Sequence, residues 1–62
     1  MNYRKLKANE VPKRQGVIRG WKCENGIIIW ELDVDNFWVT FQGHKQADSC
    51  SLAGALEIAE TL

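Results

Sequence analysis

The fold of this chain is decided by the stretch Ile27-Ile28-Ile29-Trp30-Glu31-Leu32-Asp33-Val34, which is its most apolar and most β-branched run. Turn signals bound it on both sides, with Asn25-Gly26 before it and Asp35-Asn36 after it. Short apolar runs between such residues are typical of β-strands. We predict that this run is the central strand of a three-stranded antiparallel sheet.

Two tight turns set the expected pairing of the strands. Asn25-Gly26 favours a two-residue type I′ hairpin, which would pair Trp21 with Trp30. A turn at Asp35-Asn36 would pair Leu32 with Val39. Directly paired residues point to the same face of a sheet. This register therefore predicts one apolar face, interrupted only by Arg19, that is made of Val17, Trp21, Cys23, Ile28, Trp30, Leu32, Val34, Phe37, Val39 and Phe41.

A helix is expected to follow the sheet and cover this face. The helix is predicted to cover about residues 50–61, because apolar residues recur at helical spacing from Leu52 to the end of the chain, namely Leu52, Ala55, Leu56, Ala59 and Leu62, with Ile58 beside them. Asp48 or Ser49 can cap the start of this helix. Gly54 is costly inside a helix, by about 1 kcal/mol relative to Ala, so we expect it to permit a close approach to a Trp. Residues 43–48 are expected to be a polar connection.

The N-terminal residues differ from the rest of the chain in charge. Up to Lys22 the chain has seven basic residues and one acidic residue, and after Lys22 it has seven acidic residues and one basic residue. We interpret residues 1–15 as a basic arm that docks, if at all, through Tyr3, Leu6 or Val11. Such an arm can bind nucleic acid, or it can lie over an acidic body and neutralise it. Residues 16–62 would form the domain, of α+β class, with sheet order 1-2-3 and a β-β-β-α element order.

Size and composition favour a binding module over an enzyme. The chain has 62 residues, of which 45% are hydrophobic and three are Trp, so it can form one domain with little material left for a catalytic cleft. Two cysteines, Cys23 and Cys50, are expected to remain thiols. No stretch resembles a signal peptide or a membrane span, so we expect a cytoplasmic protein that does not act at a membrane.

The sequence contains no pattern that specifies a catalytic or metal-binding site. His44, Asp48 and Cys50 are close in sequence but lack a recognised zinc spacing. Glu31 and Asp33 would share a flat face without the cleft that an acid/base pair needs. Nucleophile motifs and phosphate-binding glycine loops are absent from the sequence. We therefore expect no catalytic residues, no metal and no cofactor.

The second face of the predicted sheet is more informative, because a single helix leaves it open. The register gives this face an apolar patch with a polar rim, a composition typical of interfaces. Trp38 would be its anchor. The expected interface consists of Trp38, Ile18, Ile27, Ile29, Lys22, Glu31, Asp33 and Thr40. In the alternative arrangement, the N-terminal arm folds back over part of this face.

The outline of the chain resembles two known families. A basic arm with Arg4, Lys5, Lys7, Lys13 and Arg14, three strands and the helix Ser51-Leu52-Ala53-Gly54-Ala55-Leu56-Glu57 resemble the arm-site DNA-binding domains of phage and transposon integrases, which are AP2-like. That resemblance implies an outer sheet face in the major groove and an arm along the DNA backbone. Residues 38–41 and 49–60 also resemble the strand-then-helix half of HicB-type antitoxins.

Two functions are compatible with these features. In the first, the chain is a small interaction module of the kind that phage or mobile-element genes encode, and it binds a protein partner or forms a homodimer through the open face or an exposed strand edge. In the alternative, it binds nucleic acid, with Trp38 stacking on a base. The basic residues for that alternative are Arg4, Lys5, Lys7, Lys13, Arg14 and Arg19.

Overall fold

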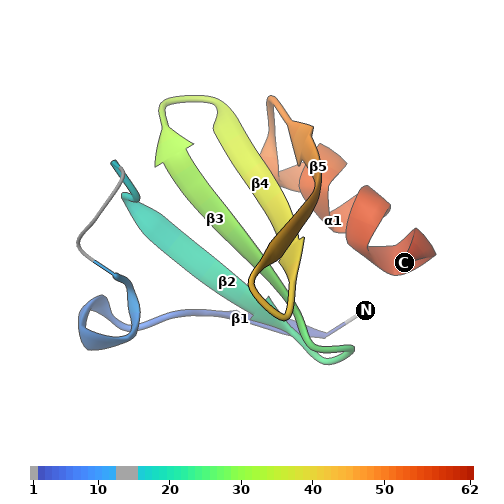
Figure 1. Ribbon diagram of the computed structural model, residues 1–62, viewed down its shortest axis with the longest axis horizontal. Coiled ribbons are helices and arrows are strands. Elements are labelled where there is room, and N and C mark those ends of the chain that lie inside the picture. The colour runs from blue at the N-terminus through green and yellow to red at the C-terminus, as the bar shows by residue number, and fades with distance from the viewer. Residues whose placement is uncertain (1, 13–15) are drawn as a thin grey trace.

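The computed structural model describes residues 2–12 and 16–62. Within these ranges the chain forms a five-stranded antiparallel sheet and one C-terminal α-helix, which lies against one face of the sheet (Figure 1). The elements are β1 (Tyr3–Lys5), a 3-10 helix η1 (Ala8–Glu10), β2 (Arg19–Cys23), β3 (Ile27–Asp33), β4 (Asn36–Phe41), β5 (His44–Ser49) and α1 (Leu52–Thr61). The α+β class and the sheet packed on one helix agree with the prediction. The expected number of strands was wrong, because the sheet has five in the order β1-β2-β3-β4-β5.

The first additional strand comes from the segment that we expected to be an arm. Tyr3, Arg4 and Lys5 pair with β2, and the backbone N–H of Leu6 donates to the carbonyl of Gly20 at 2.8 Å. Leu6 is buried, as expected of a docking residue, whereas Tyr3 remains half exposed. The basic residues Lys13 and Arg14 lie outside the described residues.

The second additional strand is β5, which replaces the expected polar connection. Gln42 and Gly43 both have positive φ, 51° and 83° respectively. Positive φ at two successive residues is the mark of a type I′ turn, which joins neighbouring strands directly. The chain therefore turns back at once, and Phe41 pairs with His44.

The first hairpin has a longer loop than expected. Gly26 has a φ of 87° but Asn25 does not adopt positive φ, which excludes a type I′ turn at these residues. The N–H of Gly26 donates to the carbonyl of Cys23 at 3.1 Å, which makes a three-residue loop. As a result Trp21 pairs with Ile29, and the predicted pairing of Trp21 with Trp30 was wrong by one residue.

The second hairpin also departs from the expected register. Asp33 pairs with Asn36, so the turn consists of Val34 and Asp35, and the pairing shifts again between Glu31 and Asp33. Val34, which we expected in the core, is 76% exposed in this turn.

These shifts invert the central strand but neither of its neighbours. Trp21 and Cys23 of β2 and Phe37 and Val39 of β4 are buried beneath α1, as predicted. On β3, however, the face toward the helix carries Ile27, Ile29 and Glu31, while Ile28, Trp30 and Leu32 lie on the open face. The predicted assignment of the two β3 faces was therefore wrong.

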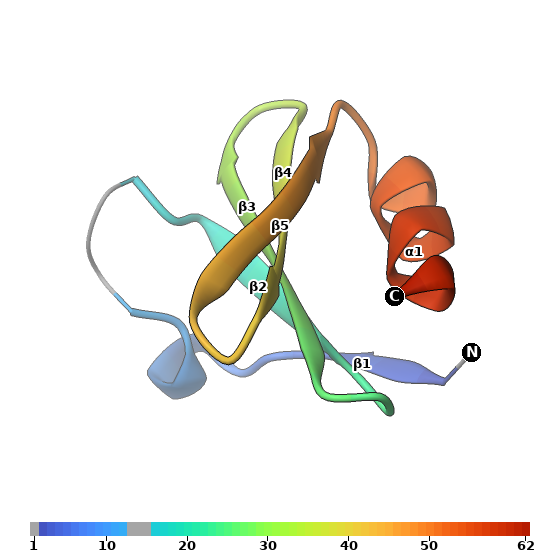
Figure 2. The same cartoon turned by 45° about the vertical axis from the view of Figure 1, so that its right-hand side comes forward.

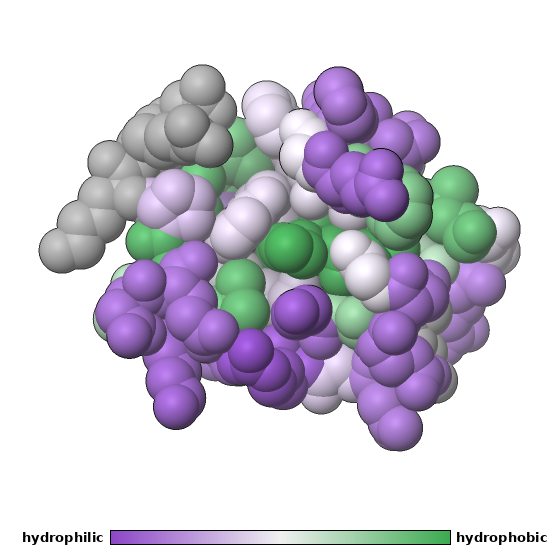
Figure 3. Space-filling model, turned by 60° about the horizontal axis from the view of Figure 1, so that its bottom comes forward, coloured by the Kyte–Doolittle hydropathy of each residue, from purple (hydrophilic) through white to green (hydrophobic). Residues whose placement is uncertain are grey.

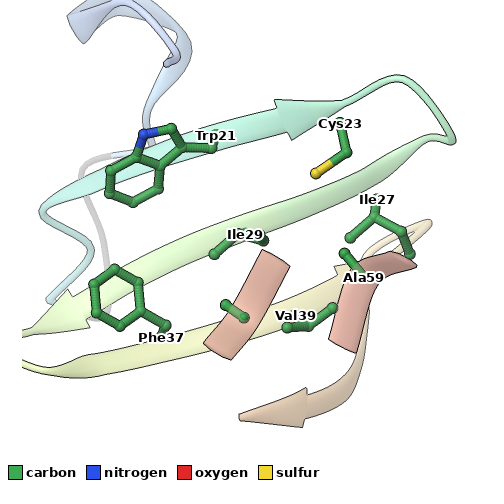
Figure 4. Close-up of a cluster of buried hydrophobic side chains, with 8 residues drawn as sticks. Trp21, Cys23, Ile27, Ile29, Phe37, Val39 and Ala59 are labelled. Carbon is green, nitrogen blue, oxygen red and sulfur yellow. The ribbon is translucent and has the colours of Figure 1, made fainter. Parts of the chain in front are cut away.

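The core lies between the sheet and α1 (Figure 4). Ile29 and Val39 are fully buried at its centre, and Ala55 and Ala59 bring the helix onto them. The rings of Trp21 and Phe37 meet at a centroid distance of 5.8 Å. The core cluster comprises Trp21, Cys23, Ile27, Ile29, Phe37, Val39, Ala55 and Ala59.

Two polar contacts fix the ends of α1. The helix begins at Leu52, later than expected, because Ser51 is its N-cap and accepts a hydrogen bond from the N–H of Gly54 at 3.0 Å. A side chain at Gly54 would collide with the Ser49 hydroxyl, so this glycine permits a close approach to β5 and not, as predicted, to a Trp. At the other end, the Asn25 side chain donates to the carbonyl of Ala59 at 3.0 Å.

Candidate functional site

The face of the sheet that α1 leaves uncovered carries the candidate site (Figure 2). Of the residues expected there, Trp38 and Thr40 of β4 lie on it, and Lys22 of β2 lies on the same face because it pairs with Ile28. Trp38 is half buried and Thr40 is buried. These three placements follow the predicted alternation of β2 and β4.

Three of the other expected residues do not lie on this face. Ile27, Ile29 and Glu31 are buried on the side of the helix, because the three-residue loop inverts β3. Ile18 is 44% exposed just before β2, and Asp33 is exposed at the end of β3, beside the register shift.

The residues that replace them are Ile28, Trp30 and Leu32, which we had assigned to the core. Trp30 pairs directly with Trp38, so two indole rings stand on neighbouring strands of the open face. The apolar run from Ile27 to Leu32 contained the signal for this, since it is hydrophobic at successive positions and must present apolar groups to both faces of a strand.

A groove of about 260 Å³ opens between these side chains. We call it the tryptophan groove, and it is lined by Pro12, Val17, Ile28, Trp30, Leu32, Trp38, Thr40, Gly43 and Lys45. Figure 3 shows hydrophobic side chains gathered toward the middle of one view of the molecule, with hydrophilic side chains flanking them. An apolar hollow with a polar border is the common form of a binding site.

Each of the two indole rings of the groove packs against another residue. A methyl group at Gly20 would lie 2.6 Å from two ring carbons of Trp30 and 3.0 Å from Cδ1 of Leu6, so the ring packs closely over the glycine backbone. On the other side of the groove, the Lys45 ammonium lies 4.5 Å from the centroid of the Trp38 ring. Asp48 holds this ammonium at 3.0 Å. These contacts favour fixed positions for both rings.

The polar groups of the groove are chiefly donors. The Thr40 hydroxyl donates to the carbonyl of Ile28 at 2.7 Å and so has used its proton. The indole N–H groups of Trp30 and Trp38 have no acceptor among residues 2–12 and 16–62, and neither nitrogen is buried without a partner. Both N–H groups therefore have no protein acceptor within these residues.

The expected nucleic-acid residues do not form one surface. Arg19 forms an ion pair with Glu31 at 3.4 Å. Lys5 stands opposite Trp21 in the pairing of β1 with β2, so it lies on the face of the sheet that α1 covers. The two terminal N–H groups of the Arg4 guanidinium each donate a hydrogen bond to the Glu10 carboxylate, with N···O distances of 3.0 Å.

The Glu10 carboxylate has several partners in the N-terminal segment. The hydrogen bonds from Arg4, together with one from the Lys7 backbone N–H, lower the pKa of Glu10 to about 2. Lys7 has an exposed side chain, and Lys13 and Arg14 lie outside the described residues.

Other candidates for chemistry are not brought together. Cys23 is buried, which raises the pKa of its thiol, whereas Cys50 is exposed. Across the described part of the chain, no group of three or more His, Cys, Asp or Glu side chains is placed to hold a metal ion. The same residues contain no helix that combines the length and the apolar character needed to cross a membrane.

Comparison with known proteins gives no relative from which a function could be transferred. Neither a family model, nor a curated protein, nor a solved structure matches this chain.

Proposed function

We propose that this protein is a small non-enzymatic binding module that engages a protein partner, or a second copy of itself, through the tryptophan groove. The observation that carries the proposal is the direct pairing of Trp30 with Trp38 on the face that α1 leaves open. Tryptophan is strongly enriched among the residues that contribute most to protein–protein binding. Apolar neighbours around such residues help to exclude water from the contact.

The edges of the sheet are less suited to binding than its face. The edge strands are β1 and β5, not the first and third strands of the predicted sheet. β1 has three residues, of which Arg4 and Lys5 are charged. β5 carries Lys45 and Asp48, and its register with β4 shifts between Val39 and Thr40. Short length, charge and irregular pairing all protect a strand edge from adding another strand.

A displayed library of random peptides tests the proposal directly. We expect the immobilised protein to enrich peptides that the double variant Trp30→Ala/Trp38→Ala no longer retains. Tyr3→Ala is the matched control, since Tyr3 is an exposed aromatic residue whose partner Cys23 faces the helix. Circular dichroism establishes that each variant is folded, and Trp38→Phe repeats the test with a smaller change.

Sedimentation over a range of protein concentrations tests for self-association. A second copy on the groove predicts a dimer that survives salt and dissociates in the double variant. The proposal is wrong if the protein enriches no peptide, remains a monomer, and behaves like its double variant in both assays.

Nucleic-acid binding is the second candidate, and two placements favour it. Glu31, which we expected on the open face, is buried on the other face beside Arg19, so its carboxylate does not repel phosphate from the open face. Trp30 joins Trp38 beside Lys45, and aromatic rings next to cations are the usual platform for single strands. Titration with a thymidine oligonucleotide separates the candidates. Its affinity should fall steeply with salt, whereas contact of a peptide with an apolar groove should not.

A further inference from the structure

We propose that the tryptophan groove takes a proline-rich segment of a partner in the extended polyproline II conformation, with a carboxylate next to the prolines. This inference rests on the proposed function, because it names the partner of the same groove. Three independent features of the groove support it: the donors it presents, the residue that the chain itself places there, and the charges on its border.

Hydrogen-bonding complementarity is the first feature. The residues that line the groove include Trp30 and Trp38, whose indole N–H groups have no acceptor in the described part of the chain, and Lys45, while the Thr40 proton is already used by the Ile28 carbonyl. A ligand for such a surface must supply acceptors. Proline has no N–H, and a polyproline II segment makes no internal hydrogen bonds, so its carbonyls are all available. Polyproline II segments bind in aromatic-lined grooves elsewhere for the same reason.

The chain itself contributes a proline to the wall of the groove. Pro12 is half buried and lines the groove together with Trp30 and Trp38. The preceding residue, Val11, has extended backbone angles of φ −95° and ψ 121°. An extended Val-Pro segment thus already forms part of the wall of the groove, and prolines of a partner would add contacts of the same kind.

The positive charges on the open face favour a carboxylate next to the prolines of the ligand. Lys45 lines the groove, and Lys22 lies on the same face, one strand from the Ile28 side chain. The carboxylate of Asp48 is engaged by Lys45, and that of Glu10 is engaged by Arg4. Among the residues that the structure describes, Lys22 has no ion-pair partner. The open face thus carries, beside the strand of Ile28, a cation without an ion-pair partner in the described residues, and such a cation complements a carboxylate on the ligand.

Three capped peptides of about nine residues test the inference; at about 3.1 Å per residue, such a polyproline II segment spans about 28 Å. That length matches the longest extent of the molecule, 28 Å. The first peptide is proline-rich with two Glu residues at one end. The second keeps the Glu residues and replaces the prolines with Ala and Leu. The third keeps the prolines and replaces Glu with Gln.

Binding is followed by NMR through the indole N–H resonances of the ¹⁵N-labelled protein. We expect the first peptide to shift the resonances of Trp30 and Trp38 and to leave that of Trp21 in place, since Trp21 is buried under the helix. The second peptide should bind at least about tenfold more weakly, by the loss of aromatic contacts that carry most of the affinity. The third should bind a few-fold more weakly, and Lys22→Gln should abolish that difference.

The outcomes separate failure of this inference from failure of the proposed function. If the first two peptides shift Trp30 and Trp38 with equal affinity, the groove binds peptides without preferring proline, and only the inference is wrong. If no peptide shifts either resonance, the displayed library gives no ligand and the protein remains a monomer in sedimentation, the proposed function is wrong as well. Tighter binding of a thymidine oligonucleotide than of any peptide would overturn the inference in favour of nucleic acid.

Discussion

Gly20 is the residue on which the shape of the open face most directly depends. Its backbone lies beneath the six-membered ring of Trp30 and beside Leu6, at distances that leave no room for a methyl group. An aromatic side chain laid over a strand glycine restores the packing that the glycine lacks. Trp30 is thereby held toward β2, away from Trp38, and the groove lies between them.

Replacing this glycine should therefore cost stability and move the ring. We expect Gly20→Ala to lower the free energy of unfolding by about 1–3 kcal/mol, the usual range for overpacking. Urea unfolding measures this change, and the Trp30 indole resonance reports the displaced ring. Lys22→Ala, two residues along the same strand and exposed, should change stability by less than about 0.5 kcal/mol. Equal stability of wild type and Gly20→Ala would contradict the packing described here.

The Arg4–Glu10 pair gives a second prediction for single residues. The folded pKa of Glu10, about 2, is below its ordinary value of 4.5. The pair therefore favours the ordered N-terminal segment above pH 4.5, and this contribution is lost as the pH falls from 4.5 toward 2. Arg4→Gln should raise the pKa of Glu10 toward 4.5, as NMR titration of its carboxyl carbon can show. Lys7→Gln should have a smaller effect, because the hydrogen bond from Lys7 comes from its backbone.

Among the elements, α1 has the most specific requirement at its start. Ser51 supplies the cap, whereas the sequence suggested Asp48 or Ser49. Ser51→Ala should reduce the free energy of unfolding by about 1 kcal/mol. Asp48→Ala removes only an exposed ion pair with Lys45 and should cost less than about 0.5 kcal/mol. Thermal or urea unfolding of the two variants distinguishes the caps, and a larger loss for Asp48→Ala would reverse the assignment.

The elements also show how far the sequence could predict the fold. The faces of β2 and β4 were predictable. Lys22 and Gly20 flank Trp21 on β2, and on β4 the polar residues Asn36 and Thr40 share one face while Phe37 and Val39 share the other. The face of β3 was not predictable, because apolar residues at successive positions satisfy either register. Asn-Gly permits loops of two or three residues. Here the bond from Asn25 to Ala59 accompanies the longer loop, and local sequence does not reveal a partner 34 residues away.

The same ambiguity limited the prediction of the site. Trp38 was expected on the open face because it alternates with the buried Phe37 and Val39. Trp30 was missed because its side depends on the loop that precedes it. β5 was missed because His44-Lys45-Gln46-Ala47-Asp48-Ser49 has little strand character, and its pairing follows from the backbone of the turn at Gln42-Gly43.

On the scale of the whole molecule, the two cysteines report on different parts of the fold. Cys23 is 2% exposed in the core and its thiol pKa is raised by burial, whereas Cys50 is exposed before α1. The thiolate is the reactive form, so burial and a raised pKa both slow modification. We expect a thiol reagent to label Cys50 rapidly and Cys23 only as fast as the sheet and helix separate. Cys50→Ser isolates the slow phase, and rapid labelling of both thiols would contradict the core described here.

The bond between Asn25 and Ala59 has a consequence for the order in which the molecule assembles. The last turn of α1 has no basic side chain to stabilise its carbonyl groups, and it follows Glu57, whose charge the helix dipole disfavours there. The β2–β3 loop supplies the missing donor, but only after that hairpin has closed. The transition state for folding should thus contain the hairpin with α1 still unformed. Asn25→Ala would then chiefly accelerate unfolding through the lost bond to Ala59, and would slow folding less, through the lost bond from the Ile27 N–H within the loop.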